Sequence, residues 1–292
     1  MVTGWLLGLA GLAIIVAYGL GIRAIRARTR APEALEQGPF SNTELERYAR
    51  HIVLREIGGP GQKALKDARV LVVGAGGLGS PALLYLAAAG VGTIGVIDDD
   101  VVDNSNLQRQ VIHRDEDIGK PKVFSAAAAM KAQNPAIIVR PYKRRLDEET
   151  ARQLFDEYDI ILEGSDNFDT KYMVNRAASG AGKPVIGGAL SQWEGQISTW
   201  DPARGGPCYQ CVFPEAPAPG LAPTCSQAGV IGPLPGVIGT MMAVETIKEI
   251  TGAGEGLRGR LMIYDALYGE TRVIGVKPRA DCPVCGGQGR GV

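Results

Sequence analysis

The stretch from Arg69 to Gly79 (RVLVVGAGGLG) constrains the fold more than any other part of the chain. Its β-branched apolar run predicts a buried strand, its glycines a tight turn, and the apolar spacing after it a helix. This is the first half of a mononucleotide-binding strand–helix–strand unit. Gly74, Gly76, Gly77 and Gly79 allow the sharp turn and a close approach of the backbone to a phosphate.

Asp98 adds an acidic residue at the distance that such a unit requires. It ends the next predicted strand, 19 residues after Gly79, where a carboxylate can hold a ribose hydroxyl. The combination predicts nucleotide binding. A tight strand-to-helix turn without a ligand is the alternative that the sequence leaves open.

Strands and helices continue to alternate along the chain. The chain has 292 residues, 45% of them hydrophobic, which is enough for one large α/β domain. The pattern predicts a Rossmann-like α/β fold, a mostly parallel sheet with helices on both faces, extended by C-terminal antiparallel strands. Strands are expected at 137–139, 160–162, 184–187 and 196–200, helices at 148–157 and 236–251, and a closing hairpin from 261–264 and 271–276.

An uncharged stretch of 18 residues at 5–22 predicts an N-terminal transmembrane helix. As a helix it is about 27 Å long, close to the ~30 Å core of a bilayer. The arginines that follow it predict a single-pass protein of the inner (plasma) membrane with its catalytic domain in the cytoplasm. The expected organisation is therefore an anchor at 1–22, a basic, Pro- and Gly-containing linker at 23–40, and a nucleotide-binding domain at 41–292. This domain opens with the capping box of Ser41 and Glu44.

Charged residues gather after Asp98 and after a later strand. Asp99, Asp100, Arg109 and Lys122 follow the phosphate-type turn, and such residues suit a nucleotide triphosphate with magnesium, although an exposed polar loop is the alternative. Asp166 follows the predicted strand at 160–162, at the sheet edge where ligands bind. The next residue, Asn167, is also a candidate cap of the following helix. The formal net charge of zero gives no reason to expect nucleic acid.

Four of the five cysteines form two pairs, Cys208-x-x-Cys211 and Cys282-x-x-Cys285. This spacing predicts a structural tetrahedral zinc site that ties the C-terminal tail to the sheet domain. The fifth, Cys225, follows a proline-rich stretch that predicts a mobile loop, and it is either a nucleophile or an unpaired thiol. With only His51 and His113, no Ser/His/Asp or Cys/His arrangement is apparent.

Taken together, these motifs resemble the ThiF/MoeB/HesA family, the bacterial relatives of ubiquitin-activating enzymes. The resemblance covers residues 41 to about 286 and includes RYARH, GAGGLG, IDDDVVDNSNLQRQ, GKPK, SDN, the segment from Thr224 to Gly239, and the final CPVC. It implies adenylation, by ATP and magnesium, of a small β-grasp sulfur carrier that ends in Gly-Gly. Because the chain ends soon after the second cysteine pair, with no rhodanese domain, a separate sulfur donor is expected.

The resemblance also implies roles for individual residues. The four glycines cradle phosphate, Asp98 holds the ribose, and Asp100 and Asn106 line the nucleotide site. Arg109 and Lys122 bind phosphates, and Asp166 helps to hold magnesium. Arg50 matches an arginine that reaches into the partner subunit's site, which implies a homodimer; from the bare sequence, its helix looks like a solvated face. Cys225 matches a cysteine that links covalently to the carrier in some branches of the family.

Two other functions compete with adenylation. A nicotinamide-dependent dehydrogenase explains the glycine turn and Asp98, but it leaves Arg50, Arg109 and the zinc-type cysteines without a role. A membrane-tethered module that docks a ubiquitin-like protein without chemistry is the other alternative. The carrier and its pathway, whether molybdopterin, thiamine or another, are not specified by the sequence.

Overall fold

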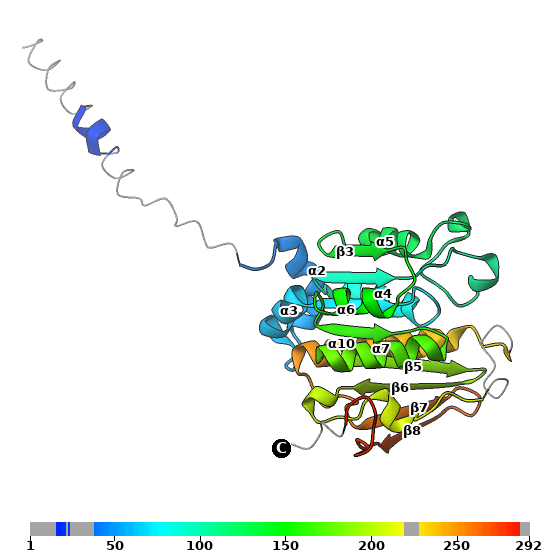
Figure 1. The fold of residues 1–292 in the computed structure, drawn as a ribbon. Coiled ribbons are helices and arrows are strands. Elements are labelled where there is room, and N and C mark those ends of the chain that lie inside the picture. Colours follow the sequence, from blue (N-terminus) through cyan, green and yellow to red (C-terminus); the bar gives the residue numbers. More distant parts are fainter. Residues whose placement is uncertain (1–15, 22, 24–37, 219–227, 287–292) are drawn as a thin grey trace, which may run out of the picture. The chain divides into compact units, whose positions relative to one another are not determined.

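A computed structural model describes residues 16–21, 23, 38–218 and 228–286. The chain divides into two units, Met1–Glu46 and Arg47–Val292, and the second contains the sheet. Figure 1 shows its strands and helices. The strands are β1 (Arg69–Val73), β2 (Thr93–Ile97), β3 (Ile138–Tyr142), β4 (Ile160–Glu163), β5 (Val185–Ser191), β6 (Glu194–Trp200), β7 (Arg260–Asp265) and β8 (Glu270–Gly275).

The helices that accompany these strands match the predicted alternation. Two were not predicted, α3 and the four-residue α8. The α-helices are α2 (Asn42–Ile52), whose residues belong to both units, α3 (Gly58–Asp67), α4 (Gly79–Ala89), α5 (Lys122–Gln133), α6 (Glu148–Phe155), α7 (Phe168–Ala181), α8 (Tyr209–Val212) and α10 (Pro233–Thr251).

The sheet has eight strands in the order β3-β2-β1-β4-β5-β6-β7-β8. The first five are parallel, and their register aligns the carboxyl ends of the central strands: Val73 of β1 lies beside Ile97 of β2 and Glu163 of β4. The chain leaves β1 and β4 in opposite directions across the sheet, so a crevice forms between the loops that follow them. The predicted Rossmann-like α/β class is confirmed.

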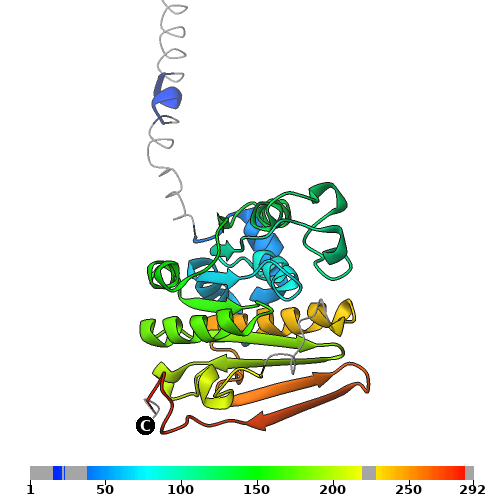
Figure 2. The same cartoon turned by 45° about the vertical axis from the view of Figure 1, so that its right-hand side comes forward.

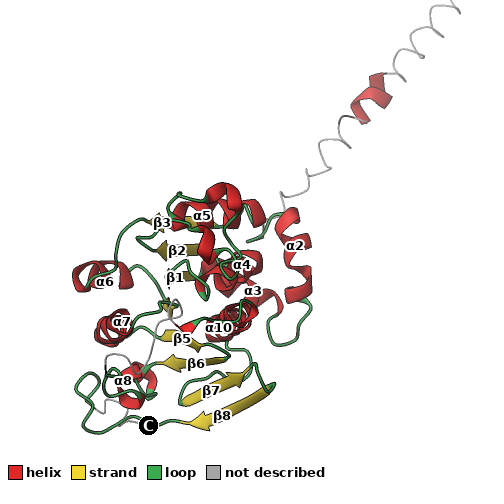
Figure 3. Ribbon diagram, turned by 90° about the vertical axis from the view of Figure 1, so that its right-hand side faces the viewer, coloured by secondary structure: helices red, strands yellow, loops and turns green. Residues whose placement is uncertain are grey.

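Alternate residues of the parallel strands face opposite layers of helices, as the two-residue period of a strand requires. In β1, Val70 and Val72 join a core that includes Leu83 and Leu86 of α4, whereas Leu71 packs in a second core. Figure 3 shows the sheet between α3, α4 and α10 on one side and α6, α7 and α8 on the other. Both faces are covered, which explains why the central strands β1, β2 and β4 are mostly apolar.

The antiparallel extension begins where β5 turns directly into β6. Ser191 pairs with Glu194 at this hairpin, and β7 and β8 continue the sheet as a second hairpin, orange and red in Figure 2. All six residues of β8 are exposed, as befits the outermost strand. The predicted C-terminal antiparallel extension is confirmed.

The predicted membrane anchor needs correction. Among the residues that the structure describes, no helix is both long and apolar enough to cross a bilayer. Of the predicted span, residues 5–15 and 22 lie outside the described part of the chain, and the helical residues 16–21 cover only about 9 Å of a ~30 Å core. The prediction of a single-pass inner-membrane protein is therefore wrong on this structure. Most of the predicted linker, residues 24–37, also lies outside the described residues.

The capping box at the start of α2 is confirmed. The Ser41 hydroxyl accepts a hydrogen bond from the Glu44 backbone N–H at 3.3 Å, and the Glu44 carboxylate accepts one from the Ser41 N–H at 2.9 Å. Two of the N–H groups that a helix leaves without an intrahelical partner are thereby satisfied.

Candidate nucleotide-binding site

The turn after β1 has the glycine requirements of a phosphate-binding loop. Gly74 has a φ of +94°, a conformation that other residues rarely adopt. A Cβ atom on Gly79 would lie 1.9 Å from the Gly74 carbonyl oxygen, a clash that any side chain would cause. Only glycine therefore fits at both ends of this turn.

The same turn presents unpaired backbone donors. Within the described residues, the N–H groups of Gly76, Gly77 and Leu78 have no hydrogen-bond partner, and α4 begins immediately after them. Free N–H groups at the start of a helix, together with the positive end of its dipole, form a site for an anion.

Asp98 lies directly beside this turn, at the end of β2. Its carboxylate accepts hydrogen bonds from the Ala75 N–H and the Asp100 N–H, both at 2.8 Å. Burial raises the pKa of the Asp98 carboxyl, and nearby Lys122 opposes that rise. Asp98 therefore fixes the shape of the turn while its carboxylate stays at the ligand edge of the sheet.

A cleft of about 830 Å³ opens at the carboxyl ends of β1, β2, β4 and β5. Ligand pockets for small molecules commonly have volumes of about 300–1,000 Å³, so a nucleotide fits. The turn lines it through Gly74, Gly76 and Gly77. The cleft is lined by both positively and negatively charged side chains. The basic residues are Arg109, Lys122, Arg144, Arg145 and Lys171, and the acidic residues are Asp98, Asp99, Asp100, Asp166, Glu194 and Glu215.

Two of the bases are held in place by neighbours. Arg109 donates to the Asn106 side chain at 2.9 Å and to the Ser105 carbonyl at 3.1 Å. Lys122 is 5% exposed and pairs with the Asp100 carboxylate at 2.7 Å. Asn106 itself is not among the residues that line the cleft, and its side chain accepts the hydrogen bond from Arg109.

Asp166 follows β4 and lines the cleft with an exposed side chain. The residue before it is fixed, because the Ser165 N–H donates to the Glu163 carboxylate at 2.8 Å. The residue after it caps α7, since the Asn167 side chain accepts from the Thr170 N–H at 2.8 Å, which confirms that predicted cap. Asp166 is thus presented between two anchored residues.

Among the described residues, three predicted site residues do not line this cleft: Arg50, Gly79 and Asn106. Arg50 is exposed on α2 and lies outside the cleft lining. Cys225 lies outside the described residues, so its role stays a prediction.

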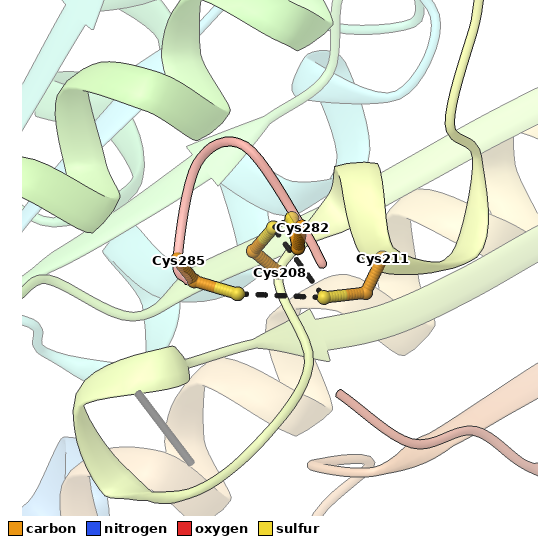
Figure 4. Close-up of side chains that lie close together, drawn as sticks. All are labelled: Cys208, Cys211, Cys282 and Cys285. Atoms are coloured by element: carbon orange, nitrogen blue, oxygen red, sulfur yellow. Dashed lines mark hydrogen bonds between the residues drawn. The ribbon is translucent and has the colours of Figure 1, made fainter. Parts of the chain in front are cut away.

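The four remaining cysteines converge as the sequence predicts (Figure 4). Their sulfur atoms lie within 4.8 Å of one another, with Cys208–Cys282 at 3.5 Å, Cys211–Cys285 at 3.4 Å and Cys208–Cys211 at 3.8 Å. These separations are too long for disulfides, whose sulfurs are about 2.05 Å apart. They match the edge of about 3.8 Å that four sulfurs form around an ion at about 2.3 Å.

The surroundings of the cysteine cluster favour a bound cation. Burial raises the pKa of the Cys208 and Cys211 thiols, whereas, despite its burial, Cys282 has a pKa lowered to about 7 by backbone hydrogen bonds. Two donors already point at the sulfurs: the Asn175 amide at 3.7 Å from Cys208 and the Arg279 N–H at 3.3 Å from Cys211. Such outer partners are typical of metal-bound thiolates.

Sequence reasoning missed three basic residues of the cleft. Arg144 and Arg145 belong to a basic run directly after β3, which was a signal at the ligand edge of the sheet. Lys171 had no signal, because it lies inside α7 and reaches the cleft only through the packing of that helix.

Comparison with known proteins identifies the family. The sequence profile of the ThiF family matches residues 48–284. The chain is 48% identical over 244 residues to the SAMP-activating enzyme E1 of Haloferax volcanii, covering 84% of this chain and 90% of that protein. It is 46% identical over 251 residues to the sulfur carrier protein adenylyltransferase of Thermus thermophilus, covering 85% and 93%.

A solved structure supports the fold. The microcin C7 biosynthetic enzyme MccB, in complex with N-formylated MccA, matches with a TM-score of 0.74 at 25% identity, over 82% of this chain and 75% of that one. The glycine turn, the charged cleft and the similarity along nearly the whole sheet-bearing unit agree, and the chain belongs to the ThiF family.

Proposed function

We propose that this protein is an ATP-dependent adenylyltransferase that activates the C-terminal glycine of a small ubiquitin-like sulfur carrier. The observation that carries the proposal is the cleft at the ends of β1, β2 and β4, where free N–H groups, two anchored bases and several carboxylates converge. The names of the two relatives in Haloferax and Thermus agree with the activity that the sequence predicts.

The reaction needs positioning and charge neutralisation more than proton transfer. The carrier's terminal carboxylate is already ionised near neutral pH, so it attacks the α-phosphorus of ATP without a general base. A bond forms between the carboxylate oxygen and phosphorus, the bond to the β-phosphate oxygen breaks, and pyrophosphate leaves with its charge. Arg109, Lys122 and the free N–H groups offset that charge.

Several residues of the cleft have distinct roles in binding ATP. Asp98 holds the ribose and Gly76 and Gly77 contact phosphate, which brings the α-phosphate to the mouth of the turn. Lys122 must exchange its partner Asp100 for a phosphate oxygen. Arg109 keeps its direction because Asn106 and Ser105 support it from behind.

Magnesium fits the acidic part of the site. The carboxylate oxygens of Asp98, Asp99 and Asp100 lie within 4.8 Å of one another, and oxygen ligands are those that magnesium prefers. Because Asp98 holds the ribose, we assign the ion to Asp99 and Asp100 of this wall together with Asp166. When bound, magnesium neutralises triphosphate charge.

The four cysteines fit a structural zinc ion. Cys208 and Cys211 flank α8, and Cys282 and Cys285 lie beyond β8, so the ion fastens the end of the chain to the segment after β6. Because all four positions are protein sulfurs, no coordination site is left for a substrate.

Arg50 favours a homodimer. It is exposed and does not line the cleft of its own chain, whereas an arginine supplied by a second copy would stabilise the phosphates. The proposed partners of this enzyme are a second copy and a sulfur carrier ending in Gly-Gly.

The test is ATP–pyrophosphate exchange with a panel of carriers that end in Gly-Gly. Arg109→Ala should lower carrier-dependent exchange by about a hundredfold or more. Arg152→Ala, an exposed arginine on α6, is the matched control and should keep parent activity. Exchange that needs no carrier, or that survives Arg109→Ala, would contradict the proposal.

A further inference from the structure

A buried histidine lies directly behind the phosphate-type turn and has no part in the chemistry above. His113 is 6% exposed. Its Nε2 lies 2.9 Å from the Ala75 carbonyl oxygen, and its Nδ1 lies 2.9 Å from the Ser125 hydroxyl. Ser125 in turn donates to Asp117 at 2.7 Å. Because a carbonyl oxygen only accepts, Nε2 carries a proton and donates to Ala75.

Hydrogen bonds at both ring nitrogens therefore fix the orientation of the imidazole, which lies outside the cleft lining. Ser125 belongs to α5, and Asp117 lies in the loop before it. His113 is not among the cleft-lining residues, so the ring does not contact a nucleotide. Its hydrogen bond to the glycine turn is the one to the Ala75 carbonyl.

Ala75 is held at both of its peptide groups. Its N–H donates to Asp98 at 2.8 Å and its carbonyl accepts from His113. A trans peptide is planar, and its C=O and the following N–H point in opposite directions. No cis peptide occurs in the described residues. The Gly76 N–H therefore points away from His113.

That direction leads toward the ligand. Gly76 lines the cleft whereas Ala75 is completely buried, and the Gly76 N–H has no partner within the described residues. Without the bond from His113, the Ala75–Gly76 peptide would be free to rotate, since glycine permits many backbone angles.

We propose that His113 is a positioning residue that orients the Gly76 N–H toward a phosphate of the bound nucleotide. The inference rests on the proposed function only in requiring that ATP occupies this cleft. His113 thus affects binding of the phosphates and has no part in recognising the nucleoside.

Two substitutions and two ligands separate this role from a general packing role. In His113→Gln, the longer amide can still donate near the position of Nε2, whereas in His113→Asn the shorter amide reaches only toward Ser125. Isothermal titration of the full chain would give the dissociation constants of ATP and of adenosine, which lacks phosphates. His113→Asn should weaken ATP binding by about tenfold to a hundredfold and leave adenosine binding unchanged. His113→Gln should stay within about threefold of the parent for ATP.

Other outcomes would refute either the positioning role of His113 or the proposed function. Equal losses for ATP and adenosine, or unchanged ATP binding by a folded His113→Asn variant, would refute the positioning role. If that variant does not fold, Ser125→Ala, which frees one side of the ring, should weaken ATP binding by about twofold to tenfold without affecting adenosine; unchanged ATP binding there would refute the role as well. A parent protein that binds neither ligand would overturn the proposed function itself.

Discussion

Replacing Lys171 with methionine should destabilise the fold by about 3–5 kcal/mol, because it removes one partner of a buried ion pair. The Lys171 ammonium pairs with Glu163, and these side chains are only 8% and 5% exposed. Lys171 also donates to the Gly188 carbonyl at 2.8 Å. Methionine has a similar length, so the loss comes from an unpaired carboxylate and carbonyl and not from a cavity.

The magnitude follows from what remains around Glu163. Its carboxylate keeps the Ser165 N–H and hydroxyl as donors, but no positive charge replaces the ammonium. For a chain of this size, about 3–5 kcal/mol corresponds to a decrease in Tm of roughly 6–20 °C. Urea unfolding and calorimetry measure both quantities.

Two control variants test whether the loss of stability comes from the unpaired buried charge. Lys63 pairs with Asp67 on the surface, with side chains 53% and 62% exposed, so Lys63→Met should change stability by less than about 1 kcal/mol. Combining Lys171→Met with Glu163→Gln should recover part of the loss, because the buried charge is removed and an acceptor for Ser165 is kept. A Lys171→Met variant that loses no more stability than Lys63→Met would refute the reasoning.

Three further predictions concern the metal, the pH dependence and the subunit arrangement. Atomic absorption of the purified protein should detect about one zinc ion per chain. Cys282→Ser should lower both the zinc content and the Tm, and full stability in a metal-free sample would contradict this prediction. Burial lowers the pKa of His113 in the folded protein, so as pH falls the imidazole is protonated in the unfolded chain before it is protonated in the folded one. The contribution of the neutral His113 to the free energy of unfolding is therefore complete above about pH 6.5 and is lost below it. Urea unfolding at about pH 7.5 and about pH 5.5 should therefore show a steeper loss for the parent than for His113→Gln, and equal slopes would refute it. Mixing inactive Arg50→Ala and Arg109→Ala subunits should restore about a quarter of parent exchange activity, since half of the dimers are mixed and half of their sites are intact; no recovery after subunit exchange would argue against a shared site.

The fold was predictable where the hydrophobic period was strong. β1, β2 and β4 were predicted within a few residues, because both faces of these strands are buried and their sequences are mostly apolar. Helix α3 was missed because it opens with Gly58, Gly59 and Pro60, residues typical of turns. Tertiary packing decides this segment, since Leu65 is completely buried in the core.

The anchor prediction rested on hydropathy alone. Hydropathy over 5–22 measures how apolar the segment is, and residues 5–15 and 22 lie outside the described part of the chain. In the described residues no helix is both long and apolar enough to cross a bilayer.

The site was predictable where its residues follow strands directly. Asp98 and Asp166 were found because the register of parallel strands brings the ends of β2 and β4 to one edge. Lys171 was not found, because its place in the cleft depends on how α7 packs beside β4. His113 was dismissed for lacking a catalytic partner, and only the structure shows it bonded to the carbonyl of Ala75.

The central claim is that this enzyme forms an acyl-adenylate on a carrier protein. Intact-protein mass spectrometry of a carrier incubated with the enzyme, ATP and magnesium tests it most directly. We expect a carrier that has gained one AMP group, a product that forms only when the C-terminal Gly-Gly of the carrier is intact and that is lost with Arg109→Ala. An unmodified carrier in the presence of folded, ATP-bound enzyme, across a panel of Gly-Gly carriers, would contradict it.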